Sequence, residues 1–259
     1  MTDLLKLARE LIPVVRAAGK IELAYFRSGT GVMDKADGSP VTLADQEAEK
    51  LIAAQLRILR PAIPMIGEES VAAGTIPDIA GGTFWLVDPL DGTKEFITGS
   101  GDFTVNIALL VNFIPVMGII YAPVADELYF GAAGEAFMSL QGKPEQKITV
   151  RPVPAAGLTV VASKRHGDPE RLNDFLKGKK VERLIQRSSS LKLCVIAAGT
   201  ADFYPRLGPT SEWDTAAGEA ILRAAGGQVT TLDGRPLVYG KSDKRFLNPE
   251  FLAFSGQSN

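Results

Sequence analysis

The chain of 259 residues contains one cysteine, Cys194, and one histidine, His166. A single cysteine excludes an internal disulfide, and these two residues are too few for a zinc site built from histidine and cysteine. An excess of charge of either sign is absent as well, because 28 basic and 30 acidic residues give a net charge of −2. A nucleic-acid surface usually appears as a basic stripe, so the charge balance argues against nucleic acid as a partner.

Long apolar runs are also rare. Four charged residues among the first ten interrupt the apolar segment that a secretory signal needs, so we expect a cytoplasmic protein. A peripheral association with the inner membrane stays open. The segment 103–125 has no charged residue and is long enough to span a membrane. Polar residues, prolines and a glycine break it up (Asn106, Asn112, Pro115, Gly118 and Pro123). This pattern favours two buried strands joined by a turn over a transmembrane segment.

Helical and strand-like segments alternate along the chain, and 46% hydrophobic residues suffice for a sizeable core. Periodicity predicts helices over 4–26, with a kink or boundary at Pro13, over 43–59, shortly after Gly92, and over 169–176, 191–198 and 215–225. It predicts strands over most of 83–138 and over 158–162, 181–185 and 228–232. The proline-bearing connector 151–156 suggests subdomains 1–150 and 151–259. Such alternation indicates an α/β protein.

Residues 85–96, W-L-V-D-P-L-D-G-T-K-E-F, form the most informative segment. An apolar run stops at Asp88 and Asp91, with Pro89 between them and Gly92 directly after. Proline favours extended backbone before it and glycine permits a tight turn, so both carboxylates can point to one spot at a strand end. Hard oxygen ligands of this kind suit Mg²⁺. The competing interpretation is a surface turn, in which Pro, Asp and Gly are common.

Acidic residues at three further places in the sequence, one of them a pair, favour the metal site. Glu68 follows the short apolar run 63–67, as the aspartates follow theirs, and Glu69 comes next. Asp214 precedes a predicted helix, where it could equally serve as an N-cap. Asp45 stands near the start of another, in a capping-box-like T-L-A-D.

Several motifs resemble those of the inositol monophosphatase-like, lithium-sensitive Mg²⁺ phosphatases. These are G-E-E-S at 67–70, D-P-L-D-G-T at 88–93 and W-D-T-A-A-G at 213–218. Longer stretches at 88–97, 189–194 and 204–218 resemble the CysQ-type 3'(2'),5'-bisphosphate nucleotidases within that superfamily. The resemblance implies a layered α-β-α-β-α sandwich (α/β, or α+β) of two abutting subdomains with the site between them.

The resemblance also implies roles for individual residues. The carboxylates of Glu68, Asp88, Asp91 and Asp214 and the backbone carbonyl of Leu90 would hold two or three Mg²⁺ ions. Asp45 and Thr93 would orient and deprotonate the attacking water, with Glu68 also in the catalytic set. Gly92 and Thr93 would hold the cleaved phosphate through their N–H groups. Residues of the C-terminal motifs would bind the rest of the substrate, namely Ser163, His166, Ser190, Lys192 and Arg206, together with Asp214.

The expected activity is hydrolysis of the 3'-phosphate of adenosine 3',5'-bisphosphate to AMP and phosphate, with the related phosphosulfate (PAPS) as a further substrate, in sulfur assimilation. Two alternatives stay open: an inositol or sugar monophosphatase of the same superfamily, and a non-enzymatic regulator that binds phosphate or metal. Gly67 stands where many CysQ-like sequences carry Ser, which favours the first alternative, whereas K-E-F after Thr93 argues against it. A monomer and a homodimer are both compatible with the superfamily.

Overall fold

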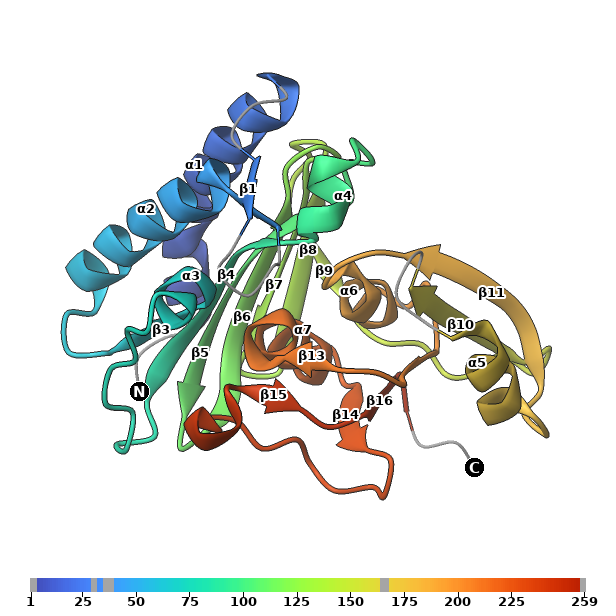
Figure 1. Ribbon diagram of the computed structural model, residues 1–259. Coiled ribbons are helices and arrows are strands. Elements are labelled where there is room, and N and C mark those ends of the chain that lie inside the picture. Colours follow the sequence, from blue (N-terminus) through green and yellow to red (C-terminus); the bar gives the residue numbers. More distant parts are fainter. Residues whose placement is uncertain (1–3, 29–31, 35–39, 164–167, 257–259) are drawn as a thin grey trace.

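The computed structural model describes residues 4–28, 32–34, 40–163 and 168–256. Two large sheets alternate with three layers of helices (Figure 1). The layers run from α1 and α2, through the larger sheet, α6 and α7 and the smaller sheet, to α5. The predicted α-β-α-β-α sandwich is confirmed.

The larger sheet has seven strands in the order β3-β4-β5-β6-β7-β8-β9. The strands are β3 Met65–Gly67, β4 Phe84–Asp91, β5 Thr104–Val111, β6 Ile114–Ala122, β7 Glu127–Ala132, β8 Glu135–Leu140 and β9 Gln146–Ile148. β3 runs parallel to β4 and the other neighbours are antiparallel. The uncharged segment 103–125 therefore forms two strands, as predicted. They are joined at Asn112 and Phe113, both with positive φ, as a tight hairpin turn requires.

Both faces of this sheet are covered, which explains its long apolar runs. Alternate residues of β4 point to opposite faces: Trp85 and Val87 to the first helical layer, Phe84 and Leu86 to the second. The first layer is α1 (Leu4–Ser28) and α2 (Leu43–Leu59). Pro13 lies inside α1, so it is not the helix boundary.

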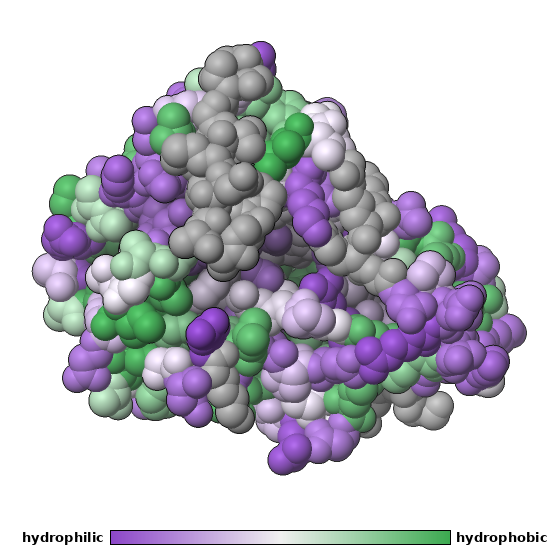
Figure 2. Space-filling view, viewed as in Figure 1, coloured by the Kyte–Doolittle hydropathy of each residue, from purple (hydrophilic) through white to green (hydrophobic). Residues whose placement is uncertain are grey.

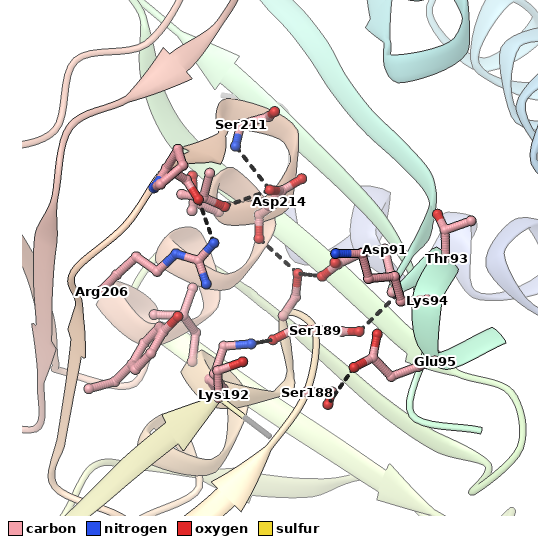
Figure 3. A pocket seen from close by; sticks show the side chains of 18 of the residues that line it. Asp91, Thr93, Lys94, Glu95, Ser188, Ser189, Lys192, Arg206, Ser211 and Asp214 are labelled. Carbon is pink, nitrogen blue, oxygen red and sulfur yellow. Dashed lines mark hydrogen bonds between the residues drawn. The ribbon is translucent and has the colours of Figure 1, made fainter. Parts of the chain in front are cut away.

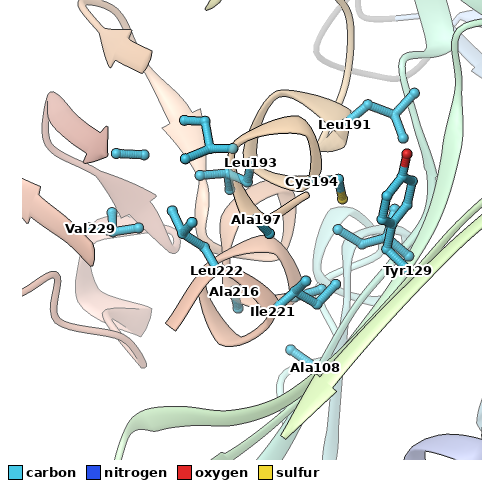
Figure 4. Close-up of a cluster of buried hydrophobic side chains, with 14 of the residues drawn as sticks. Ala108, Tyr129, Leu191, Leu193, Cys194, Ala197, Ala216, Ile221, Leu222 and Val229 are labelled. Atoms are coloured by element: carbon cyan, nitrogen blue, oxygen red, sulfur yellow. The ribbon is translucent and has the colours of Figure 1, made fainter. Parts of the chain in front are cut away.

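The second layer is α6 (Leu191–Ala197) and α7 (Glu212–Ala224), packed between the two sheets (Figure 4). Cys194 is fully buried in this layer, close to Tyr129 of the larger sheet, and burial raises the pKa of its thiol well above the usual range. A Cβ at Gly118 of β6 would collide with the backbone of Ala217. Glycine there lets α7, from the C-terminal part of the chain, lie directly on the larger sheet.

The smaller sheet has the order β11-β10-β12-β16-β14. Its strands are β10 Leu158–Ser163, β11 Val181–Arg187, β12 Phe203–Arg206, β14 Gln228–Thr231 and β16 Phe251–Phe254. α5 (Pro169–Leu176) covers its outer face, where Phe175 stacks on Phe203 at a centroid distance of 6.3 Å. This outer region of α5 and β11 is strongly hydrophilic (Figure 2).

The remaining elements are small: α3 Glu68–Ala72, α4 Thr93–Ile97, the 3₁₀ turn η1 Ser242–Lys244, and the strand pairs β1 Val32–Asp34 with β2 Pro40–Thr42 and β13 Thr210–Ser211 with β15 Leu247–Asn248. The prediction was wrong on one helix start, because α7 begins at Glu212 and not at 215. Asp214 is consequently not an N-cap. It is the third residue of the helix, and its carboxylate accepts a hydrogen bond from the N–H of the N-cap Ser211 (2.9 Å).

Candidate active site

A bulge in β4 brings the two motif aspartates to one face of the sheet. Asp88 pairs with Asn106 and Asp91 pairs with Thr104, so three steps along β4 match two along β5. Residues three apart in a regular strand point to opposite faces, and the extra residue of a bulge reverses this. The D-P-L-D spacing therefore allows both carboxylates to face the same site.

Asp214 reaches this site from the start of α7. One carboxylate oxygen from each of Asp88, Asp91 and Asp214 lies within 4.8 Å of the others. Burial raises the pKa of Asp91 to about 6, and the charge of Asp214 adds to the effect, whereas Lys192 lowers this pKa. Such crowding of buried carboxylates is unfavourable without a cation, and their oxygen atoms are the ligands that Mg²⁺ binds. The residues fit a divalent metal.

Two further predicted carboxylates approach the cluster from the first helical layer and from α3. Burial raises the pKa of Asp88 well above its usual range, and the charges of its neighbours raise it further, in the order Glu68, Asp91, Asp214 and Asp45. Glu68 is the first residue of α3. Asp45 lies in the first turn of α2 and is 2% exposed. Both are therefore close enough for their charges to act on Asp88.

The turn that follows the bulge leads from the carboxylate cluster to an adjoining cavity. Gly92 has φ of +100°, a left-handed conformation that favours glycine, and precedes the short helix α4. A Cβ there would collide with the hydroxyl of Ser189. Thr93 opens α4, and its hydroxyl donates to the carbonyl of Leu90 at 3.4 Å. Gly92 and Thr93 both line the adjoining cavity of about 420 Å³.

The opposite wall of this cavity comes from the C-terminal half and carries two cations (Figure 3). Lys192, 7% exposed, donates to the carbonyl of Ser189 at 2.5 Å and lies over the Tyr204 ring. Arg206 donates to the carbonyls of Gly208 (3.3 Å) and Pro209 (2.5 Å). Ser163 also lines the cavity. His166 lies outside the described residues.

Three consecutive serines connect the two walls, and only Ser190 among them was predicted at the site. The Ser188 hydroxyl donates to the Glu95 carboxylate at 3.1 Å, and Ser189 Oγ lies 2.9 Å from the carbonyl of Asp91. Ser190 Oγ lies 2.7 Å from Asp91 Oδ2 and accepts a hydrogen bond from Asn106. The Ser190 hydroxyl thus contacts a carboxylate of the acidic cluster. The polar run R-S-S-S directly before an apolar helix was the available signal for Ser188 and Ser189.

Comparison with known proteins identifies the family. The model of the inositol monophosphatase family matches residues 3–251. The chain belongs to this family. It is 43% identical over 245 residues to the 3'(2'),5'-bisphosphate nucleotidase CysQ of Escherichia coli O6:H1, covering 93% of this chain and 97% of that protein. CysQ of Buchnera aphidicola is 39% identical, with 96% and 93% covered.

Solved structures of the family agree in fold. CysQ from Bacteroides thetaiotaomicron superposes with a TM-score of 0.80 at 37% identity, covering 98% of each chain. Inositol monophosphatase from Anabaena superposes with a TM-score of 0.76 at 27% identity, covering 98% of this chain and 92% of the other. None of the helices in the described part of the chain is both long and apolar enough to cross a membrane.

Proposed function

We propose that this protein is a Mg²⁺-dependent 3'(2'),5'-bisphosphate nucleotidase, which hydrolyses the 3'-phosphate of adenosine 3',5'-bisphosphate and also accepts PAPS. One observation carries the proposal. Half-buried carboxylates of the cluster, Asp91 and Asp214, line a cavity, and buried or half-buried cations, Lys192 and Arg206, stand on the facing wall. A substrate with two separated phosphates matches both walls. The identity to CysQ proteins over nearly the whole chain supports the same substrate class.

The metal ligands in this proposal are Glu68, Asp88, Asp91 and Asp214 with the carbonyl of Leu90, and they hold two or three ions. Mg²⁺ bound there neutralises charge on the phosphate and favours both the deprotonated nucleophile and the leaving alkoxide. The chain's own contribution is to hold these ligands in place: the N–H of Leu90 donates to Asp88 Oδ1 at 3.0 Å, and Ser190 and Asn106 contact Asp91 Oδ2.

Asp45 and Thr93 handle the proton of the attacking water. In this role the Thr93 hydroxyl would give up its long bond to the carbonyl of Leu90 (3.4 Å) and donate to Asp45. The threonine oxygen would then accept from water, and the proton would pass to the Asp45 carboxylate. Asp45 is buried, so its carboxylate is shielded from bulk water. The N–H groups of Gly92 and Thr93 bind the phosphate that is cleaved.

The phosphate that is retained meets Lys192 and Arg206. Both already donate to backbone carbonyls, and each has further donors that can reach an anion. Ser163, His166, Ser190 and Asp214 complete the substrate contacts. The protein would act in the cytoplasm in sulfur assimilation, as a monomer or a homodimer.

One alternative has an observation in its favour. The fold also matches inositol monophosphatases such as that from Anabaena, and hydrolysis of an inositol or sugar monophosphate would use the same carboxylate cluster. Such a substrate needs no cation for a second phosphate. A non-enzymatic regulator would instead bind phosphate or metal without turnover.

A single comparison tests the proposal. Phosphate release is measured from adenosine 3',5'-bisphosphate and from inositol 1-phosphate, each with Mg²⁺ and with EDTA. We expect Mg²⁺-dependent release with a higher kcat/KM for the bisphosphate. A preference for inositol 1-phosphate would support the monophosphatase alternative, and no release from either substrate would support the regulator.

A further inference from the structure

A buried carboxylate outside the predicted site, Glu49, contacts the short helix that begins at the proposed metal ligand Glu68. Glu49 is on α2 and is 5% exposed. Its Oε2 accepts from the N–H of Glu69 at 2.8 Å, and its Oε1 accepts from the N–H of Ser70 at 2.9 Å and from the Ser70 hydroxyl at 2.5 Å. These groups belong to the first turn of α3, which Glu68 opens.

This contact replaces the usual capping of a helix. The first N–H groups of a helix have no partner within it and need an outside acceptor. The N-cap of α3 is Gly67, which has no side chain to supply one. Glu49 supplies both oxygens from a different helix. The orientation of the first turn of α3, and with it that of Glu68, is consequently fixed to α2.

The same helix carries the proposed base. Asp45 and Glu49 are four residues apart on α2, so they lie on one face of that helix. Asp45 acts electrostatically on Asp88 of the metal cluster, while Glu49 holds the segment that carries Glu68. One rigid element therefore sets the distance between the base and a metal ligand.

Glycine is required at position 67 because there is no room for a side chain, and not because of its backbone angles. Its φ of −115° and ψ of 149° are ordinary extended values. A Cβ at this position would lie 2.5 Å from Cδ and Oε2 of Glu49 and 2.7 Å from Oε1. Any side chain at 67 would push the carboxylate off the N–H groups of α3. Glycine at 67 is thus explained by Glu49 and carries no information about the substrate.

We propose that Glu49 is a positioning residue for the metal ligand Glu68, and that glycine at position 67 leaves room for the Glu49 carboxylate. The proposal rests on the metal role of Glu68 in the proposed function. Ser70 shares in the contact through its hydroxyl. Loss of the Glu49 carboxylate leaves the N–H groups of Glu69 and Ser70 without their acceptor and allows Glu68 to turn away from the cluster.

The test compares Glu49→Ala with Glu47→Ala. Glu47 is on the same helix but is exposed, with its carboxylate accepting from the Tyr25 hydroxyl at 2.7 Å. Mg²⁺ binding is measured by calorimetry without substrate, and the Mg²⁺ concentration for half-maximal activity is measured separately. We expect Glu49→Ala to weaken Mg²⁺ binding by roughly 10- to 100-fold, as is typical for the partner of a metal ligand, and Glu47→Ala to leave it unchanged.

Glu49→Gln provides the conservative variant, because it keeps one acceptor oxygen and should restore part of the Mg²⁺ affinity. If Glu49→Ala lowered Tm but bound Mg²⁺ as the wild type does, Glu49 would be structural only and the proposal would be wrong. If the wild type bound Mg²⁺ but released no phosphate from the bisphosphate, the proposed substrate would be wrong while the Mg²⁺ measurement still decided the role of Glu49.

A second pair of variants tests the space at Gly67 and does not depend on Glu49→Ala folding well. Gly67→Ala should weaken Mg²⁺ binding by at least about tenfold in the wild type, because the new methyl group displaces the carboxylate. In the Glu49→Gln background the same substitution should cost less, so the two effects should not add. Additive effects would show that the two residues act independently and would overturn the pairing.

Discussion

The two halves of the chain contribute different chemistry to the same cavity. Residues before 150 supply clustered carboxylates and a tight glycine turn, on the bulged strand β4 and around it. Residues after 150 supply Lys192 and Arg206 on the facing wall. In the proposed function, bond cleavage depends on the first wall and the choice of substrate on the second, so substitutions on the two walls should have different consequences.

The separation is incomplete at one point. Asp214 comes from the C-terminal half but belongs to the metal cluster, because α7 crosses back onto the larger sheet. Ser190 then connects the halves, with its Oγ 2.7 Å from Asp91 Oδ2 and 2.8 Å from the carbonyl of Asp214. The carboxylate cluster therefore combines residues from both halves of the chain.

The largest expected effect is on the carboxylate wall. Asp91→Asn keeps the shape of the side chain but removes a charge that holds the metal. Charge stabilisation by the metal is worth several kcal/mol, so turnover at limiting Mg²⁺ should fall by roughly 10³-fold or more on every substrate. Calorimetry should show weaker Mg²⁺ binding, whereas the exposed Asp78→Asn should change neither. Wild-type turnover of Asp91→Asn would refute the metal assignment.

The next largest effect concerns the transfer of a proton from the attacking water. If Thr93 relays between Asp45 and water, Thr93→Ala should lower kcat by ~10² to 10⁴, the range of general acid–base catalysis, with Mg²⁺ binding largely kept. Thr93→Ser retains the hydroxyl and should recover much of the rate. Stopped assays of phosphate release with both variants provide the measurement. Equal damage from the two substitutions would indicate that the methyl group matters for packing and would count against the relay.

On the cationic wall, the effect should be smaller and selective. A charge-assisted hydrogen bond is worth about 1.5 to 3 kcal/mol, roughly a ten- to hundredfold change in kcat/KM. Arg206→Ala should weaken use of adenosine 3',5'-bisphosphate by that factor and leave inositol 1-phosphate nearly unchanged. Because Arg206 also donates to the carbonyls of Gly208 and Pro209, a uniform loss on both substrates would indicate that its role is to hold this loop.

These walls were only partly predictable from the sequence. Local patterns identify β4, the turn at Gly92 and α6, because apolar periodicity and turn residues act over a few positions. The bulge between Asp88 and Asp91 was not predicted, although Pro89 and the two aspartates were noted; the register with β5 decides it. β12 was missed because it contains Pro205, which weakens a strand pattern, and the short β16 was missed as well.

Contacts between distant residues were beyond local reasoning. Ser190 and Asp91 are 99 positions apart, and no spacing rule relates them. Glu49 was not singled out from the sequence. Its burial and its bonds to Glu69 and Ser70 distinguish it from the exposed Glu47 on the same helix. The start of α7 was placed too late because the acidic Asp214 suggested a cap, whereas Ser211 is the N-cap.

The smallest expected effect comes from a substitution of Glu219 on α7, the helix that joins the two halves. It should change the stability of the protein without changing its choice of substrate. Burial raises the pKa of Glu219 from 4.5 to about 7, while the Tyr239 hydroxyl donates to it at 2.6 Å and, with Arg223, lowers the pKa. A raised folded-state pKa means that the folded protein holds the proton more tightly than the unfolded chain. The contribution of protonated Glu219 to the stability of the fold is therefore complete below about pH 4.5 and is lost as the pH rises through about 7.

Urea unfolding of the metal-free protein at pH 5 and pH 8 measures this contribution. Other buried carboxylates act in the same direction, so the comparison is between the wild type and Glu219→Gln, which has no titrating group at that position. One pKa unit corresponds to about 1.4 kcal/mol, so the loss of unfolding free energy between the two pH values should be smaller in the variant by roughly 1–3 kcal/mol. The ratio of activities on the bisphosphate and the monophosphate should stay that of the wild type, since Glu219 does not line the cavity. An identical pH dependence in both proteins would mean that Glu219 is ionised in the folded state, and a changed substrate ratio would mean that α7 transmits its packing to the cationic wall.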